Sequence, residues 1–216
     1  MRNILLLSLL ILFVSCSKTD TKTNVPLEVH GNWTSERGYA NSYFDVEIEI
    51  PETWYLQKGK PERLSEDASE FLAGEDKNLK SSIKSAVDET FSPFWAYRHP
   101  PGTPGKTNPN VTFLIENVMH LPGVQTGGDY LLLLEDTLKL SNKEIVFTGT
   151  PQQIVLADSE YFSTETKIPM GEITITTQYF AKKKGEYILL IATNYISGMD
   201  EVTLAEAFDS IKSTKS

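Results

Sequence analysis

One strand with two chemically different faces constrains the fold of this chain more than any other feature. In residues 41–54 apolar side chains alternate strictly with acidic ones: Phe44, Val46, Ile48 and Ile50 with Asp45, Glu47 and Glu49. Because successive side chains of a strand point to opposite faces, the apolar face must be buried while the acidic face meets solvent. Pro51 has no N–H to donate to a neighbouring strand, so we expect the strand to end there.

Three helices are expected in the middle of the chain. Ser65 and Asp76 are candidate N-caps for the first two helices, and Thr126 or Asp129 begins the third. Apolar residues follow at helical spacing: Ala68, Phe71 and Leu72; Leu79, Ile83, Ala86 and Val87; and Leu131, Leu134 and Leu138. This spacing gives each helix one face to bury against another layer.

Extended segments dominate the rest of the chain, at residues 111–119, 154–168, 173–181 and 187–195. The last two are joined by a lysine-rich turn that contains Gly185, and Thr203-x-x-Glu206 forms a capping box for a closing helix. Helices mixed with adjacent hairpins predict an α+β fold, a largely antiparallel β-sheet covered by helices. We find no internal repeat and predict a single domain.

The N-terminus has the form of a secretory signal. Arg2 precedes an apolar run at residues 4–14 that only Ser8 interrupts. A membrane-spanning helix needs about 20 apolar residues, so this run is too short to span and fits a signal peptide over residues 1–15.

The end of this signal, Phe13-Val14-Ser15-Cys16, resembles the lipobox of bacterial lipoproteins, although Phe13 stands where leucine is commoner. The resemblance implies cleavage before Cys16 and fatty acylation of its sulfur and its new amino group, which would anchor the protein in a membrane. The alternative is an ordinary signal peptide with an incidental cysteine. Cys16 is the only cysteine, so the chain can form no internal disulfide. Residues 16–31 are expected to form the lipidated cysteine and a flexible tether, and residues 32–216 the domain.

Two short segments resemble PsbP-like domains. Residues 43–54 look like the start of that family, an aromatic strand followed by P-x-x-W, and residues 204–212 look like its closing helix. The resemblance extends over most of residues 39–213 and implies an antiparallel sheet between helical layers, an α/β/α sandwich. Family members act mainly as non-catalytic accessory or partner-binding modules, and the resemblance implies that role here.

We find no pattern that predicts a catalytic, metal or cofactor site. His30, His99 and His120 lack the spacing of a zinc site, and the acidic row at Asp45, Glu47 and Glu49 is better interpreted as a solvated face than as a cation site. The formal charge of −9 and a pI near 4.9 argue against nucleic acid as a partner, because phosphate binding needs clustered lysine and arginine.

The segment most typical of a binding surface is residues 91–109. It places Phe94, Trp95, Tyr97, Arg98 and His99 directly before a loop rich in proline and glycine. Aromatic and arginine side chains are common anchors of interfaces, so this set is a candidate binding loop. The alternative is that Trp95 and Tyr97 belong to a strand that faces the core.

The sequence therefore predicts a lipid-anchored, non-enzymatic protein of the cell envelope that binds a protein partner. Ser17 after Cys16, where some bacteria carry an aspartate for inner-membrane retention, favours the outer membrane over the inner membrane. The alternative is a small-ligand protein with a pocket between sheet and helices, lined by Trp54, Trp95 and Tyr179. A hydrolase with dispersed residues is less favoured, because it would need a buried His99 or His120 near a serine or a carboxylate.

Overall fold

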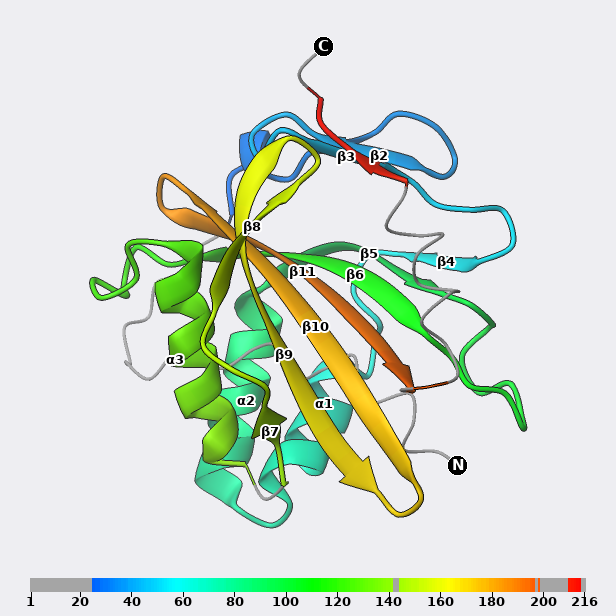
Figure 1. The fold of residues 1–216 in the computed structure, drawn as a ribbon, viewed down its shortest axis with the longest axis vertical. Helices are drawn as coiled ribbons and strands as arrows, with labels where there is room; N and C mark the ends of the chain where they lie inside the picture. Colours follow the sequence, from blue (N-terminus) through cyan, green and yellow to red (C-terminus); the bar gives the residue numbers. More distant parts are fainter. Residues whose placement is uncertain (1–24, 142–143, 197, 199–209, 215–216) are drawn as a thin grey trace.

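The computed structural model describes residues 25–141, 144–196, 198 and 210–214, which form three layers (Figure 1). A four-stranded sheet lies above an eight-stranded sheet, and three helices lie against the other face of the large sheet. The chain is thus a mixed α+β domain dominated by antiparallel sheet, as the sequence predicts. No helix among the described residues combines the length and apolar character needed to span a membrane.

The large sheet has the strand order β4-β5-β6-β11-β10-β9-β7, and β8 also pairs with β9. In chain order its strands are β4 (Tyr55–Lys58), β5 (Phe91–Tyr97), β6 (Asn110–Asn117), β7 (Val146–Phe147), β8 (Gln152–Leu156), β9 (Ser159–Met170), β10 (Ile173–Lys184) and β11 (Tyr187–Ile196). Every strand pair is antiparallel.

The expected single run at residues 154–168 is a hairpin of β8 and β9. Ala157 and Asp158 form its turn with φ angles of 49° and 54°. Two successive left-handed residues make a two-residue hairpin turn whose twist suits the strands it joins. Glycine or asparagine usually signals such a turn, and alanine at the first position concealed it. The lysine-rich turn is also shorter than expected, because Lys182, Lys183 and Lys184 belong to β10.

The small sheet consists of β1 (Asn32–Trp33), β2 (Gly38–Asn41), β3 (Val46–Glu49) and β12 (Ile211–Lys212), in that order. It confirms the two-faced strand over β3, where Val46 and Ile48 are at most 3% exposed and Glu49 is exposed, and Phe44 and Ile50 are buried beside it. Asp45 departs from the pattern: it lies in the turn before β3 with a φ angle of 59°, and its carboxylate pairs with Lys184. A short 3-10 helix, η2 (Leu27–Val29), precedes this sheet.

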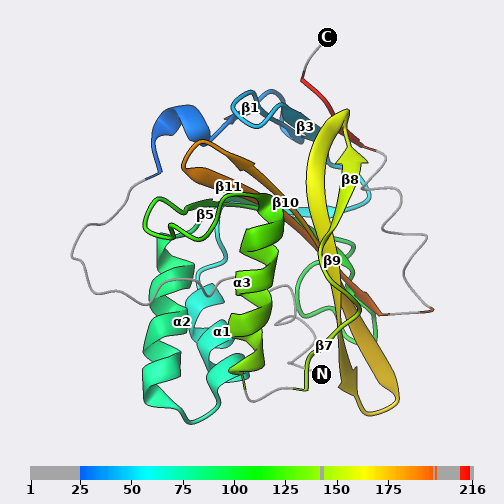
Figure 2. The ribbon, with the colours of Figure 1, turned by 60° about the vertical axis from the view of Figure 1, so that its left-hand side comes forward.

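The three helices are α1 (Leu64–Ala73), α2 (Lys77–Glu89) and α3 (Gly127–Lys139), which stand together on one face of the large sheet (Figure 2). Asp76 caps α2 as predicted, because its carboxylate accepts the N–H groups of Asn78 and Leu79. Thr126, rather than Asp129, caps α3, and the two residues form a capping box. Ser65 lies inside α1 and does not cap it.

Each face of the large sheet buries its own hydrophobic core. The helices and the sheet enclose a first core, and the two sheets enclose a second. Leu114 of β6 faces the first core, while its neighbours Phe113 and Ile115 face the second. Covering both faces explains the almost continuous apolar sequence of β6 and β11.

The second outer layer is therefore a small sheet in the part of the chain that the structure describes, where the family resemblance implies helices. The expected closing helix, from Thr203, lies outside the described residues.

The folded domain begins earlier than residue 32. Val29 is 1% exposed, and the Asn41 side-chain amide donates a hydrogen bond to the Val29 carbonyl oxygen at 2.8 Å. His30 stacks on Phe91 with ring centroids 3.8 Å apart. Residues 25–31 thus belong to the domain rather than to the tether, because they fill the edge of the second core.

Candidate functional site

The predicted binding segment is mostly buried in the structure. Phe94, Trp95 and Tyr97 lie in β5 and are 0%, 1% and 3% exposed. β5 lies between β4 and β6, so its alternate side chains enter both cores: Phe94 the second, and Trp95 and Tyr97 the first. The interpretation of these aromatics as interface anchors is wrong, and the core-facing strand is the correct alternative.

Arg98 and His99 follow β5 and remain partly exposed. The Arg98 guanidinium donates to Thr53 Oγ1 at 2.9 Å. The Asn108 side chain closes the loop after them, because it accepts from the His99 N–H at 2.8 Å and donates to the His99 carbonyl oxygen at 3.0 Å. The loop 99–109 is therefore held at its base and projects from one end of the large sheet (Figure 1).

The aromatics expected to line a ligand pocket lie on different sides of the large sheet. Trp95 and Tyr179 belong to the first core and Trp54 to the second, and each is at most 2% exposed. They belong to two separate cores, so they do not form the expected common pocket.

The histidines are also dispersed. His30 is stacked on Phe91, His99 begins the loop after β5, and His120 is exposed in the loop between β6 and α3. Over the described ranges, no three side chains of histidine, cysteine, aspartate or glutamate gather in a way that could hold a metal ion.

Glu116 is the carboxyl group with the most perturbed environment. It lies on β6 on the helix side of the sheet, and the hydroxyl of the buried Tyr130 donates to its Oε2 at 2.7 Å. Burial raises the pKa of Glu116 to about 7; the Tyr130 hydrogen bond opposes this shift and the Glu89 carboxylate adds to it. Burial therefore favours the protonated form of Glu116, and no local sequence pattern indicated it.

A cavity of about 530 Å³ lies at the N-terminus of α3, beside the end of β10. Its three lysines are already engaged. Lys182 Nζ donates to the Phe44 carbonyl oxygen at 2.6 Å, Lys184 Nζ lies 3.1 Å from Asp45 Oδ2, and Lys183 Nζ donates to the Gly185 carbonyl oxygen at 2.7 Å.

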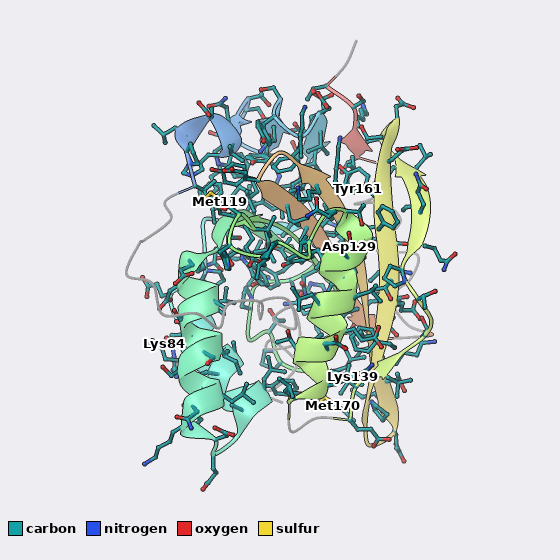
Figure 3. All side chains as sticks on the ribbon, turned by 90° about the vertical axis from the view of Figure 1, so that its left-hand side faces the viewer. Lys84, Met119, Asp129, Lys139, Tyr161 and Met170 are labelled. Atoms are coloured by element: carbon teal, nitrogen blue, oxygen red, sulfur yellow. The ribbon has the colours of Figure 1, made fainter. Side chains whose placement is uncertain are left out.

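The helix end beside these lysines is occupied by a carboxylate of the chain itself. Asp129 Oδ2 accepts the N–H groups of Gln125 at 3.1 Å and Thr126 at 2.8 Å, at the first turn of α3 (Figure 3). Its negative charge lies in the first turn of α3, where the helix dipole favours a carboxylate. We therefore interpret this end of the molecule as a structural junction that ties the β2–β3 turn to β10.

A second cavity, of about 410 Å³, lies over β9 and β10, and we call it the β9–β10 cavity. Four of its side chains share the face of the large sheet that carries the second core. Glu165 pairs with Gln178 in the register of β9 and β10, and Ser163 pairs with Phe180. The remaining lining residues are Thr148, Gly149, Thr150, Gln152 and Thr164.

Sequence reasoning missed the β9–β10 cavity. Its residues come from β9, β10, the first residue of β8 and the segment between β7 and β8, which the sequence placed in no common element. The available signal was weak, because it was only a group of polar residues on a strand face that is otherwise apolar. The polar residues are Ser163, Glu165 and Gln178, and their neighbours on that face, Tyr161 and Phe180, pack in the second core. Only the pairing of β9 with β10 brings them together.

No family model and no curated protein matches the chain. Among solved structures it is similar to LpqN of Mycobacterium tuberculosis, described as involved in cell envelope biogenesis, with 11% identity, a TM-score of 0.40, and 77% of this chain and 82% of that chain covered. It is similar to the cyanobacterial PsbP of Synechocystis sp. PCC 6803 with 9% identity, a TM-score of 0.43, and 92% and 99% covered. A protein of Bacteroides thetaiotaomicron VPI-5482 gives 9% identity and a TM-score of 0.42 over 83% of this chain and 48% of that chain, so this chain spans about half its length.

Proposed function

We propose that this protein is a lipid-anchored, non-enzymatic accessory protein of the cell envelope that binds a protein partner. The observation that carries the proposal is the sequence Phe13-Val14-Ser15-Cys16 after a short apolar run, with Cys16 the only cysteine of the chain. One acyl chain holds a protein on a membrane only marginally, and several chains on one residue make a lasting anchor.

The start of the folded domain sets the distance from this anchor. Eight residues, 17–24, separate Cys16 from Val25, the first described residue. Eight extended residues span at most about 30 Å, so the proposal places the domain close to the bilayer surface. Loss of Arg2 with the signal peptide changes the charge of the chain from −9 to −10, which disfavours flat contact with anionic headgroups. A domain that is held close to the bilayer, but whose acidic surface is repelled by anionic lipids, favours a protein partner at the membrane. Ser17 favours the outer membrane over the inner membrane.

Replacing Cys16 with serine is expected to move the protein out of the membrane fraction or to leave its signal peptide uncleaved, because the acylated sulfur is lost. Thr21→Ser, a change in the same segment that keeps the cysteine, is the matched control and should fractionate like the parent protein. Membrane fractionation and intact-mass spectrometry of the native protein measure both effects. A Cys16→Ser protein that fractionates with membranes like the parent, or an unmodified thiol at position 16, contradicts the lipid anchor.

The partner is expected to contact Arg98 and the adjoining loop 99–109, which Asn108 holds at its base. Affinity capture from detergent-solubilised membranes should recover the same partner repeatedly with the parent protein. Arg98→Ala should fold normally, because the side chain is partly exposed, and should recover less of that partner. Repeated recovery of the protein alone contradicts the accessory role.

A further inference from the structure

The β9–β10 cavity has the lining of a site for a neutral polar ligand. Its side chains are hydroxyls, amides, one carboxylate and one aromatic ring: Thr148, Thr150, Ser163 and Thr164; Gln152 and Gln178; Glu165; and Phe180. Its volume of about 410 Å³ lies within the usual range for small-molecule sites, about 300–1,000 Å³.

Gln152 Nε2 donates to the Thr150 carbonyl oxygen at 3.0 Å, but the side-chain hydrogen bonds between β9 and the neighbouring segments of this cavity are long. Gln178 Nε2 lies 3.4 Å from Glu165 Oε2, and Tyr195 Oη lies 3.5 Å from the same oxygen. Thr164 Oγ1 lies 3.5 Å from the Gly149 carbonyl oxygen. Protein hydrogen bonds usually measure about 2.7–3.2 Å for N–H···O and about 2.5–3.0 Å for O–H···O, so Gln178 and Thr164 keep hydrogen-bonding capacity for a ligand.

Two buried hydroxyls on the same face of the sheet, which do not line the cavity, have no hydrogen-bond partner among the described residues. Thr193 lies directly opposite Gln178 in the register of β10 and β11, and Tyr161 lies two residues before Ser163 on the same face of β9, toward the small sheet (Figure 3). Within the described part of the chain, Thr193 Oγ1 and Tyr161 Oη have no hydrogen-bond partner, although both residues are 0% exposed. Buried polar groups normally have a hydrogen-bond partner, so this face of the sheet carries more hydrogen-bonding groups than the described residues pair with one another.

The charges of the cavity point to an uncharged ligand. Glu165 is the only ionised side chain among the described residues of the lining, and Lys167 Nζ lies 3.3 Å from its Oε1. The opposite charges of Glu165 and Lys167 leave little net charge to attract an ionic ligand, while the carboxylate can still accept hydrogen bonds.

Phe180 supplies the apolar side of the site. It packs against the second core and also lines the cavity beside the polar group of Ser163. An aromatic face beside hydroxyls and amides suits a ligand with both C–H faces and hydroxyl edges. We propose that the β9–β10 cavity binds a neutral saccharide, whose ring packs on Phe180 and whose hydroxyl groups bond to Gln178 and Glu165.

Saturation-transfer-difference NMR on the full chain, purified in the sugar-free detergent lauryldimethylamine oxide, tests this proposal. The probes are the neutral sugars glucose, galactose, mannose, N-acetylglucosamine, cellobiose and chitobiose. The controls are two charged sugars, glucosamine and glucuronate, and triglycine, a neutral compound that is not a saccharide. At least one neutral sugar should receive saturation, and the charged sugars and triglycine should receive less. Isothermal titration then measures the affinity of the best sugar.

Gln178→Met keeps the side-chain volume and removes the amide, so it should weaken that affinity by about tenfold or more. Ser163→Ala, a smaller change in the same cavity, should weaken it in the same direction. Gln153→Met is the matched control: Gln153 is exposed on β8 outside the cavity, and its replacement should leave the affinity unchanged.

The proposal is overturned if no neutral sugar receives saturation, or if charged sugars or triglycine bind better. It is equally overturned if Gln178→Met and Ser163→Ala, folded by circular dichroism, bind like the parent. If the monosaccharides bind as tightly as the disaccharides, the site is one for free saccharides. If cellobiose or chitobiose binds with much higher affinity than its monomer, the site is one for a glycan chain.

Discussion

Replacing Trp95 with alanine is expected to lower the free energy of unfolding by about 3–5 kcal/mol, the usual cost of truncating a large core aromatic. The Trp95 ring is 1% exposed and stacks beside Tyr97, with ring centroids 6.3 Å apart, in the core between the large sheet and the helices. Urea unfolding followed by circular dichroism measures the change.

Arg98→Ala is the control for this experiment, three residues along the same segment. Its guanidinium is partly exposed and bonds to Thr53, so its loss should cost at most about 1 kcal/mol. If both variants were as stable as the parent, Trp95 would lie at the surface, and the interpretation of residues 94–99 as one binding surface would return.

Replacing Glu116 with glutamine is expected to stabilise the protein at pH 8 by about 3 kcal/mol, and to change little at pH 5. The pKa of Glu116 is about 7 in the folded protein, against an ordinary value of 4.5. Each unit of difference corresponds to about 1.4 kcal/mol. A carboxyl whose pKa is raised by folding stabilises the fold while it is protonated, and this contribution is lost as the pH rises from about 4.5 through 7.

Thermal unfolding at a series of pH values tests this expectation. The melting temperature of Glu116→Gln at pH 8 should exceed that of the parent by about 6–12 °C, since about 1 kcal/mol corresponds to about 2–4 °C in a domain of this size. Glu172→Gln, a change in the exposed turn between β9 and β10, should follow the pH profile of the parent. A Glu116→Gln profile that runs parallel to the parent's would mean that Glu116 does not titrate in this range.

Local patterns in the sequence predicted most of the elements correctly, because the physics behind them is local. The alternation around Val46 and Ile48 is a property of any half-buried strand, and the caps at Asp76 and Thr126 need only a side-chain oxygen beside the first turn of a helix. The prediction failed at the β8–β9 turn, where Ala157 adopts a backbone conformation that alanine rarely prefers.

The binding segment shows why composition is a poor guide to exposure. Phe94, Trp95 and Tyr97 have the side chains of an interface, but the same side chains also fill cores, and their sequence is the same in both cases. Their burial follows from the position of β5 between β4 and β6, with a layer against each face of the sheet. No residue near them in the sequence carries that information.

The sequence by itself determined the fold class, the caps of α2 and α3 and the half-buried strand around Val46, and it predicts a lipid anchor at Cys16, because each depends on residues a few positions apart. The tertiary structure alone decided which aromatic residues are buried, raised the pKa of Glu116 and assembled the β9–β10 cavity. These three properties depend on strand pairing and on burial from both faces, which join residues such as Glu165 and Gln178 across a hairpin and Glu116 and Tyr130 across two layers.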